Sequence, residues 1–433
     1  MSAARLVLPR DAWPPLRSEQ ARRAVALFVY GLVLLWAAAE VLRSLARADR
    51  LDYTGYVALG RIVLDRGDPY GPAFSTWPPF FQFPAALLAL GSRVSAGATL
   101  AIWQVLSVLS VWGALRILTR WFEGQVPTFL PKAVDRPAFV SAAVLVPFLY
   151  MARLLQDNLQ HGQINAMLLF LSLFAFDLFR SGRARSGGFS LALAASVKAV
   201  PAALVGYLVV KRAWREAAWT VAWLVILNVL LPAVAFGPER ALAHWHSWRA
   251  VAAAQTSEPI AHYPNQSLLS ALRRLLSREG GAVNPVSYAV AAWSPGTVQT
   301  VFLAIAGLGA ALLAAVFVRQ RGLAGPRAAG EIALCLGAMT LVSPLAWTAH
   351  YVTLLAPCAL AWWGLRRLEP GAPGRRWKWG LWWGAFALLT LSAQGIAGGA
   401  GNRVLLSCSA ITAGALLVLA LAASLLPPAE RPA

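Results

Sequence analysis

Residues 298–318 read VQTVFLAIAGLGAALLAAVFV and contain no charged side chain. An α-helix rises 1.5 Å per residue, so about 20 such residues cross the ~30 Å hydrocarbon core of a bilayer. Three further stretches have similar length and apolar character, at residues 22–43, 215–236 and 403–425. The sequence therefore predicts an all-α, polytopic membrane protein.

The composition supports this class. Of the 433 residues, 58% are hydrophobic and 13% are charged, whereas soluble proteins carry about 25% charged residues. The net charge of +20 comes from short basic clusters between the apolar runs, which is typical of cytoplasmic loops. The sequence has no contiguous basic face, zinc-knuckle spacing or stacking motif, which argues against a nucleic-acid partner.

The basic clusters predict the topology, because lysine and arginine accumulate in cytoplasmic loops. Three longer segments then lie outside, at residues 44–78, 153–163 and 237–297. Both termini lie inside. We expect one transmembrane domain over residues 21–426, with an N-terminal tail at 1–20 and a C-terminal tail at 427–433. The basic clusters are the N-terminus, 116–136, 180–185, 211–215, 319–327 and 366–378.

Two regions do not fit simple alternation of full spans. Residues 79–119 contain two apolar runs joined near 93–97, and residues 187–210 lie between two cytoplasmic clusters. Half-length helices explain both; such helices occur where they are buried in protein or line a polar cavity. We expect a short hairpin, 186–197 and 201–210, with Lys198 at its tip. The total is roughly 11–13 transmembrane or half-length helices.

The first outer segment, 44–78, contains a predicted amphipathic helix from Tyr53 to Leu64. Asp52 comes just before it, where a carboxylate can face the outer boundary and act as a general base on a hydroxyl. The alternative is that Asp52, Asp65 and Asp68 pair with neighbouring arginines on a solvated helix. Asp49, in the same segment, has the same two interpretations.

The second and third outer segments carry amide and imidazole groups. His161, Gln163 and Asn165 open an apolar span and offer donors to a polar ligand, unless they only cap the helix. Asn265 and Gln266 follow later. His244 and His246 are spaced like a metal pair, but no third ligand has suitable spacing, so we predict no metal site.

The last polar corner contains His350, after Ser343-Pro344-Leu345-Ala346-Trp347. A lone histidine near a helix end is often structural. The predicted topology, however, brings His350 to the same outer boundary as Asp52, His161, His262 and Lys198. A single polar site there would combine carboxylate, imidazole, amide and ammonium groups. No Ser/His/Asp order, Walker loop or dinucleotide glycine motif is present.

Six short motifs in this order resemble the bacterial integral-membrane glycosyltransferases of family 87, which have the GT-C fold. The resemblance extends from about residue 50 to 365. This family includes polyprenol-phosphate-mannose-dependent mannosyltransferases. The motifs are Asp52, 66–70 (RGDPY) with 77–80 (WPPF), 161–165 (HGQIN), 196–201 (SVKAVP), 265–268 (NQSL), and 343–347 (SPLAW) with His350.

The resemblance implies transfer of a sugar, mannose first, from a polyprenyl-phosphate donor to a hydroxyl of a glycolipid or glycan, with inversion. Asp52 would be the general base, and no cofactor or metal is implied. The site would face the periplasm from the bacterial inner membrane. Donor-phosphate and substrate-binding roles are implied for Lys198, His350, His161, Gln163, Asn165, Asn265, Gln266, Asp68 and Tyr70. Thr348 and Ala349 stand where the family often has an acidic residue or second histidine.

Three alternatives remain open. A transporter or flippase of a lipid-linked or polar substrate would also use half-length helices, but the sequence shows no internal repeat. An O-antigen-ligase-like enzyme would use a lipid-diphosphate donor. A membrane scaffold would leave the outer polar residues unexplained. Asp52→Asn discriminates among these, because it should abolish transfer but only modulate transport.

Overall fold

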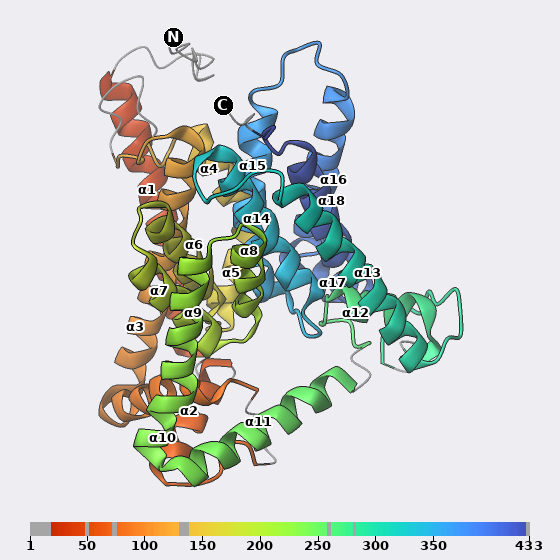
Figure 1. Cartoon of the computed structure of the whole chain (residues 1–433). Helices are drawn as coiled ribbons and strands as arrows, with labels where there is room; N and C mark the ends of the chain where they lie inside the picture. Colours follow the sequence, from red (N-terminus) through yellow and green to blue (C-terminus); the bar gives the residue numbers. More distant parts are fainter. Residues whose placement is uncertain are drawn as a thin grey trace.

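The structure is a computed structural model that describes residues 19–47, 52–71, 76–129, 138–257, 261–279 and 283–429. Within these ranges every regular element is helical, which confirms the all-α prediction. The start of α1 (Glu19–Ala46) and the end of α18 (Ala410–Ser424) lie at one end of the molecule, called the terminal end (Figure 1). Helices α2 (Asp52–Leu64) and α11 (Pro238–Ser257) lie toward the opposite end, called the site end.

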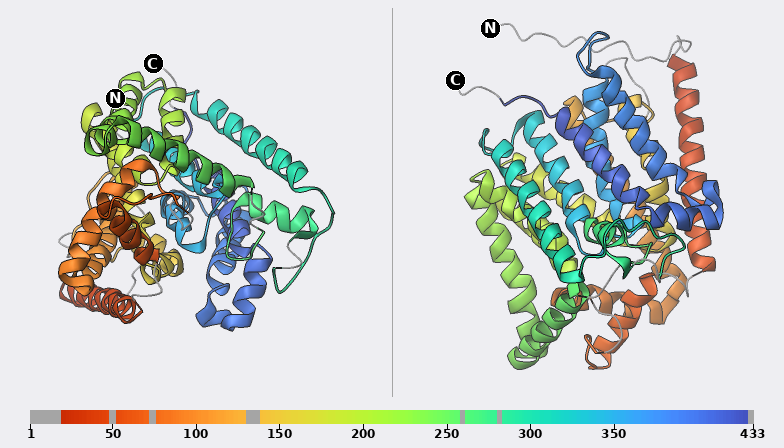
Figure 2. Two further views of the ribbon diagram at one scale, coloured as in Figure 1. Left: turned by 90° about the horizontal axis from the view of Figure 1, so that it is seen from below. Right: turned by 90° about the vertical axis from the view of Figure 1, so that its right-hand side faces the viewer.

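Four helical stretches among the described residues are long and apolar enough to cross a membrane: Arg23–Ala46, Pro79–Glu123, Trp214–Phe236 and Pro295–Phe317. Helix α1 lies at the edge of the bundle in both views of Figure 2. Leu34 on α1 and Leu308 on α13 (Pro295–Phe317) are 67% and 61% exposed. Such surfaces suit contact with lipid rather than water, so these helices form the periphery of a multi-pass membrane protein.

Two further pairs qualify as broken spans. Helices α5 (Ala152–Gln160) and α6 (Asn165–Arg180) meet at 119°, and α16 (Arg375–Leu391) and α17 (Gln394–Ser407) meet at 87°. The prediction of a single spanning helix over 403–425 is therefore wrong, because this stretch is divided between α17 and α18. Ser409, with φ of 59°, separates α17 from α18, and its hydroxyl accepts hydrogen bonds from Nε and Nη2 of buried Arg274. The left-handed backbone at this serine interrupts the helix.

The predicted break at 93–97 is confirmed. Helix α3 (Gln82–Glu123) contains one non-helical residue, Ser95, with φ of −158° and ψ of 107°. The Ser95 hydroxyl accepts a hydrogen bond from the Ala98 amide at 3.2 Å, which caps the second part of α3. The chain therefore changes direction at Ser95, but the second part of α3, residues 96–123, is long enough for a full span, so the expectation of half-length helices is wrong for that part.

The predicted hairpin with Lys198 at its tip is also confirmed. Helix α7 (Ala184–Val197) ends at Lys198, whose backbone is extended, and the 3₁₀ helix η3 (Val200–Ala202) leads into α8 (Ala203–Val210). Residues that flank this hairpin contact α13 and the turn that follows it: Nη1 of Arg180, at the end of α6, donates to Leu323 O at 3.2 Å, and Nζ of Lys211, at the end of α8, donates to Phe317 O at 3.2 Å. The tip therefore points toward the site end.

Helix α2 is amphipathic as predicted and packs closely on α3. Its buried face includes Tyr53, Tyr56 and Gly60. A Cβ atom at Gly60 would lie 1.9 Å from the carbonyl oxygen of Ala85, so only glycine permits this approach. Tyr56 contacts the rings of Trp77, Phe81 and Trp103. This packing fixes the first residue of α2, Asp52, against the bundle.

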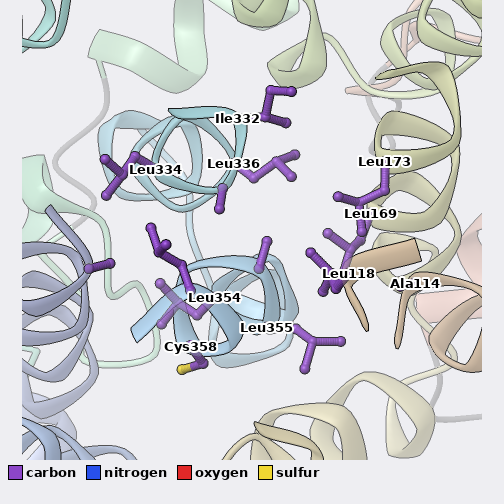
Figure 3. Packing of buried hydrophobic residues seen from close by; sticks show 14 of the residues in the cluster. Ala114, Leu118, Leu169, Leu173, Ile332, Leu334, Leu336, Leu354, Leu355 and Cys358 are labelled. Atoms are coloured by element: carbon purple, nitrogen blue, oxygen red, sulfur yellow. The ribbon is translucent and has the colours of Figure 1, made fainter. Parts of the chain in front are cut away.

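The central core lies beneath the site. Figure 3 shows Leu336 and Leu355 extending toward Leu169 and Leu118, whereas Cys358 lies on another side of the helix that carries Leu355. These side chains come from α14, the η6–α15 segment, α3 and α6, which surround one packed region. The remaining helices are α4 (Ala142–Tyr150), α9 (Trp214–Val225), the π-helix η4 (Ile226–Leu230), α10 (Leu231–Phe236), α12 (Leu268–Leu276), α14 (Gly325–Val342), the 3₁₀ helix η6 (Thr348–Leu354) and α15 (Leu355–Leu365).

Candidate active site

Asp52 begins α2 and is held against the corner between α5 and α6. Its backbone amide donates to the carbonyl of His161 at 3.0 Å. Its Oδ2 accepts a hydrogen bond from Gln163 Nε2. Oδ1 receives no hydrogen bond from the residues that the structure describes. A half-buried carboxylate at a helix N-terminus is favoured by the helix dipole, and one of its oxygens remains available to a ligand.

The amides of Gln163 and Asn165 lie behind Asp52. Gly162, with φ of 61°, turns the chain between α5 and α6. The Gln163 carbonyl accepts from Asn158 Nδ2 at 3.1 Å, which fixes the turn. Asn165 Nδ2 donates to Gln163 Oε1 at 3.2 Å and to Ala349 O at 3.4 Å. The two amide residues are 7% and 4% exposed, so their orientation is set by protein contacts.

Lys198 reaches this pair from the hairpin tip. Its Nζ donates to Asn165 Oδ1 at 3.0 Å and lies 2.9 Å from His350 Nε2. Burial lowers the pKa of Lys198 to about 8, although the charge of Asp52 acts in the opposite direction. Burial and the neighbouring Lys198 hold the pKa of His350 well below its ordinary value. At pH 7 an ammonium therefore faces a neutral imidazole.

These five residues form one hydrogen-bonded set, which we call the polar network: Asp52, Gln163, Asn165, Lys198 and His350. They come from α2, the α5–α6 corner, the hairpin tip and η6. The network places a carboxylate at one end and a cation with an imidazole at the other. Such an arrangement can remove a proton at one point and stabilise negative charge at another.

A small cavity lies beside the cationic end. It has a volume of about 30 Å³, and Lys198, His350 and Asn165 line it together with apolar side chains such as Leu168 and Met339. This volume holds one or two water molecules. Lys198 therefore faces a small and largely apolar pocket, where a charge interaction is stronger than at an open surface.

A much larger cavity of about 1170 Å³ opens on the other side of η6. It reaches the polar network through His161, whose carbonyl binds the Asp52 amide, and through Trp347, whose amide donates to His350 Nδ1 at 3.2 Å. Amides, charged groups and aromatic rings share its wall, which suits a ligand rich in hydroxyls. The lining also includes Trp36, Arg47, Arg153, Gln156, Asp157, Gln160, Tyr263, Thr348, Gln394 and Asn402.

A family model described as glycosyltransferase family 87 matches residues 76–344, which is more than half of the chain. The chain belongs to glycosyltransferase family 87. The matched range includes Gln163, Asn165 and Lys198 of the polar network, while Asp52 and His350 lie outside it. The resemblance inferred from the motifs is thus confirmed at the level of the family, and the protein is a glycosyltransferase.

A curated protein of Mycobacterium tuberculosis (strain CDC 1551 / Oshkosh) is similar to this glycosyltransferase. The two chains are 26% identical over 375 residues, which cover 84% of this chain and 78% of the relative. The relative is named polyprenol-phosphate-mannose-dependent alpha-(1-2)-phosphatidylinositol pentamannoside mannosyltransferase. No solved structure matches this family 87 chain significantly.

Asn265 and Gln266, which the sequence also suggested for substrate binding, lie buried beneath the large cavity. Asn265 Oδ1 accepts from the Ala346 amide at 3.0 Å, and its Nδ2 donates to Pro344 O at 3.1 Å. Gln266 Nε2 donates to Leu406 O at 2.8 Å. In this structure the Asn265 side chain joins the 261–266 loop to the segment before η6, and the Gln266 side chain joins it to α17 and α18. They therefore support the cavity wall from behind.

Asp68 and Tyr70 form a second polar group, apart from the polar network in this glycosyltransferase. The Tyr70 amide donates to Asp68 Oδ1 at 2.9 Å. The ring of Tyr70 lies 6.0 Å from that of His244, whose Nδ1 is 3.2 Å from Gln82 Nε2. This group connects the first outer segment to α11. The Tyr56 aromatic group described above lies between it and Asp52 on α2 and α3.

One supporting residue was not predicted. Glu40, inside the first span, accepts hydrogen bonds from Arg43, from Gln156 Nε2 at 2.8 Å and from Gln160 Nε2 at 3.1 Å. It fixes α5 against α1 and so positions one wall of the large cavity. A carboxylate within an apolar span is itself a signal of function, which could have identified Glu40 from the sequence.

Proposed function

We propose that this glycosyltransferase transfers mannose from a polyprenyl-phosphate donor to a hydroxyl group of a glycolipid or glycan acceptor. The observation that carries the proposal is the polar network, in which two buried amides link a carboxylate to a cation from a distant segment; His161, whose carbonyl accepts from the Asp52 amide, lines a large polar cavity. The name of the mycobacterial relative supports the choice of donor and sugar.

Asp52 acts as the general base in this proposal. Its free Oδ1 takes the proton of the acceptor hydroxyl, and the oxygen attacks the anomeric carbon of the donor sugar. The bond from that carbon to the phosphate oxygen breaks, its electron pair leaves with the polyprenyl phosphate, and the configuration inverts. General-base assistance of this kind contributes about 10²–10⁴-fold to the rate.

Lys198 and His350 receive the leaving phosphate. Lys198 uses one N–H for Asn165 and lies 2.9 Å from His350 Nε2, so a further N–H can reach a phosphate oxygen. Negative charge grows on that oxygen in the transition state, so a cation in a largely apolar pocket stabilises the transition state more than the ground state. One such donor is worth about 2.7–4 kcal/mol.

The large cavity receives the acceptor. Pockets for drug-sized ligands measure about 300–1,000 Å³, so a cavity of about 1170 Å³ accommodates more than a single hexose. His161 lines it next to Asp52, where it can bind an acceptor hydroxyl. Trp36 of α1 also lines it, and α1 lies at the edge of the bundle (Figure 2), which offers a lateral route for an acceptor anchored in the membrane. No cofactor enters the reaction.

The proposed orientation places the site at the periplasmic face of a bacterial inner membrane, within one transmembrane domain over residues 21–426. Basic segments lie at the terminal end, where Arg180 contacts Leu323 and Gly325 and Arg367 contacts Glu123. Such segments mark the cytoplasmic side. The polar network then lies toward the other face.

The test compares transfer from radiolabelled polyprenyl-phosphate mannose into membrane lipid by wild type and by Asp52→Asn at matched expression. Asp65→Asn is the matched control, because Asp65 directly follows α2 in the same outer segment and is an exposed carboxylate near Arg93. We expect incorporation by wild type and Asp65→Asn, and a loss of at least about 10²-fold in Asp52→Asn.

Each outcome has a separate meaning. Equal incorporation by wild type and Asp52→Asn would remove Asp52 from the mechanism and direct attention to Asp49, which lies outside the described residues, or Asp68. Absence of incorporation by wild type, with the protein folded, would overturn the choice of donor. A lipid-diphosphate sugar would then be the next donor to assay.

A further inference from the structure

The amides of Gln163 and Asn165 have a single possible orientation in the polar network. A lysine ammonium can only donate hydrogen bonds, so Asn165 must present its oxygen to Lys198. An ionised carboxylate can only accept, so Gln163 must present its NH₂ group to Asp52. The remaining contact then joins Asn165 Nδ2 to Gln163 Oε1, as observed at 3.2 Å.

Every donor in this row therefore points from Lys198 toward Asp52. Hydrogen bonds aligned in one direction polarise one another, with a strengthening of about 10–30% per bond. Both amide residues are almost fully buried, which keeps water from interrupting the row. A change of charge at one end is thus transmitted to the other through the two side chains.

We infer that Gln163 and Asn165 are positioning residues, an amide relay that couples Lys198 to Asp52, and that they do not bind the sugar. This inference rests on the proposed function, because it assigns the two ends of the relay to the base and the leaving group. The relay occupies Oδ2 of Asp52 and so selects Oδ1 as the oxygen that faces the acceptor.

The relay also keeps the base and the cation apart. A direct ion pair would occupy the Asp52 carboxylate and neutralise the charge of Lys198. Two interposed amides hold both groups in place while neither neutralises the other. A further hydrogen bond holds the hairpin near its tip. Asn228 Nδ2, in the π-helix η4, donates to the hydroxyl of Ser196 at 2.6 Å.

The first experiment detects coupling without substrate or turnover. The chain contains few lysines (Lys132, Lys198, Lys211 and Lys378), so ¹³C labelling of lysine Cε resolves Lys198, with Lys198→Met giving its assignment. The pH midpoint of the Lys198 signal is compared in wild type and Gln163→Leu. Gln163 does not touch Lys198, yet we expect the midpoint to fall by about 0.3–0.5 pH unit.

The control is Gln104→Leu. Gln104 is a buried glutamine whose Nε2 donates to Ser44 Oγ at 2.9 Å and to Leu159 O at 2.8 Å, outside the relay. It should lower thermal stability without moving the Lys198 midpoint. A midpoint that stays constant in Gln163→Leu, or that moves equally in Gln104→Leu, would overturn the inference.

The second experiment separates positioning from sugar binding. In Gln163→Leu we expect kcat to fall about 10–100-fold while KM for the acceptor changes by less than about twofold. A rise in KM at constant kcat would instead identify Gln163 as a sugar ligand. If wild type transfers nothing from polyprenyl-phosphate mannose, the proposed function fails, but the Lys198 titration still decides whether the relay exists.

Discussion

The molecule uses buried charges in two contrasting ways, at its two ends. At the terminal end, Lys211 and Arg327 bind the same carboxylate directly: Lys211 Nζ is 2.7 Å from Glu331 Oε2, and Arg327 Nε is 3.1 Å from Glu331 Oε1. Tyr207 also donates to Glu331 at 3.1 Å. We call these four residues the ion cluster. In the polar network, by contrast, amides separate Lys198 from Asp52.

The difference shows what each end does. In the ion cluster every charge is met by a protein partner, and the side chains of Lys211 and Glu331 are fully buried. These contacts join α8, α13 and α14. In the polar network, Asp52 Oδ1 receives no hydrogen bond from the residues that the structure describes, and Lys198 lines the small cavity. Direct pairing stabilises the fold, whereas separated charges serve a ligand.

The largest expected effect comes from breaking the ion cluster. Glu331→Gln leaves two buried cations without a carboxylate and should lower the free energy of unfolding by about 3–5 kcal/mol. Denaturant titration in detergent measures this. Glu369→Gln, an exposed acid at the same end, is the control and should change stability little. A change below about 1 kcal/mol for Glu331→Gln would show that the ion cluster is not a structural device.

The complementary change at the site end is Lys198→Met. We expect transfer to fall about 10²–10³-fold, because the leaving phosphate loses its cation. Stability should change far less than in Glu331→Gln, since Lys198 is half-buried and has no direct carboxylate partner. Lys378→Met at the terminal end is the matched control. If Lys198→Met mostly unfolds but its remaining folded fraction transfers sugar at the normal rate, Lys198 has a structural role and no role in transfer.

The pH dependence of transfer sharpens the comparison. Because the pKa of Lys198 is lowered to about 8, its ammonium loses a proton as the pH rises through that value. Transfer should therefore fall above about pH 8, approaching tenfold per pH unit. Lys198→Arg keeps its charge at high pH, so its activity, whatever its level, should lack this fall. The same decline in both proteins would exclude Lys198 as its source.

The smallest expected effect concerns Glu40. This residue combines the direct ion pair of the ion cluster with the amide contacts of the polar network, because it binds one arginine and two glutamine amides. Glu40→Gln exchanges hydrogen bonds to a charged group for neutral ones and should cost about 1 kcal/mol of stability. Transfer should fall by less than about fivefold, since α5 retains its other contacts. A loss comparable with that of Asp52→Asn would give Glu40 a direct role in the reaction.

Much of the fold follows from the sequence, because hydropathy indicates where the apolar helices lie, and glycine and proline positions indicate where they end. The hairpin with Lys198 at its tip and the break near Ser95 both appear where the apolar runs are too short or too long for one span. The division at Ser409 could not be predicted. It depends on Arg274, which lies far away in the sequence and reaches that serine only in the folded protein.

The sequence predicted which residues belong to the candidate site better than it predicted the contacts among them. The sequence brought Asp52, Lys198 and His350 to one boundary, and the structure joins them with Gln163 and Asn165. It could not distinguish these from Asn265 and Gln266, which are equally polar. The distinction depends on neighbours: backbone groups of α17, of α18 and of the segment before η6 use the hydrogen-bonding groups of Gln266.

The hairpin α7–α8 has a consequence for how the protein is assembled in the membrane. Both of its ends lie at the terminal end, so the ammonium of Lys198 has to pass through most of the bilayer to reach the site end. A charged tip entering lipid alone is costly, whereas a slot between α6, α9 and α14 offers protein partners. We expect the hairpin to insert late, after those helices are in place, so that Lys198 is among the last residues to reach its position.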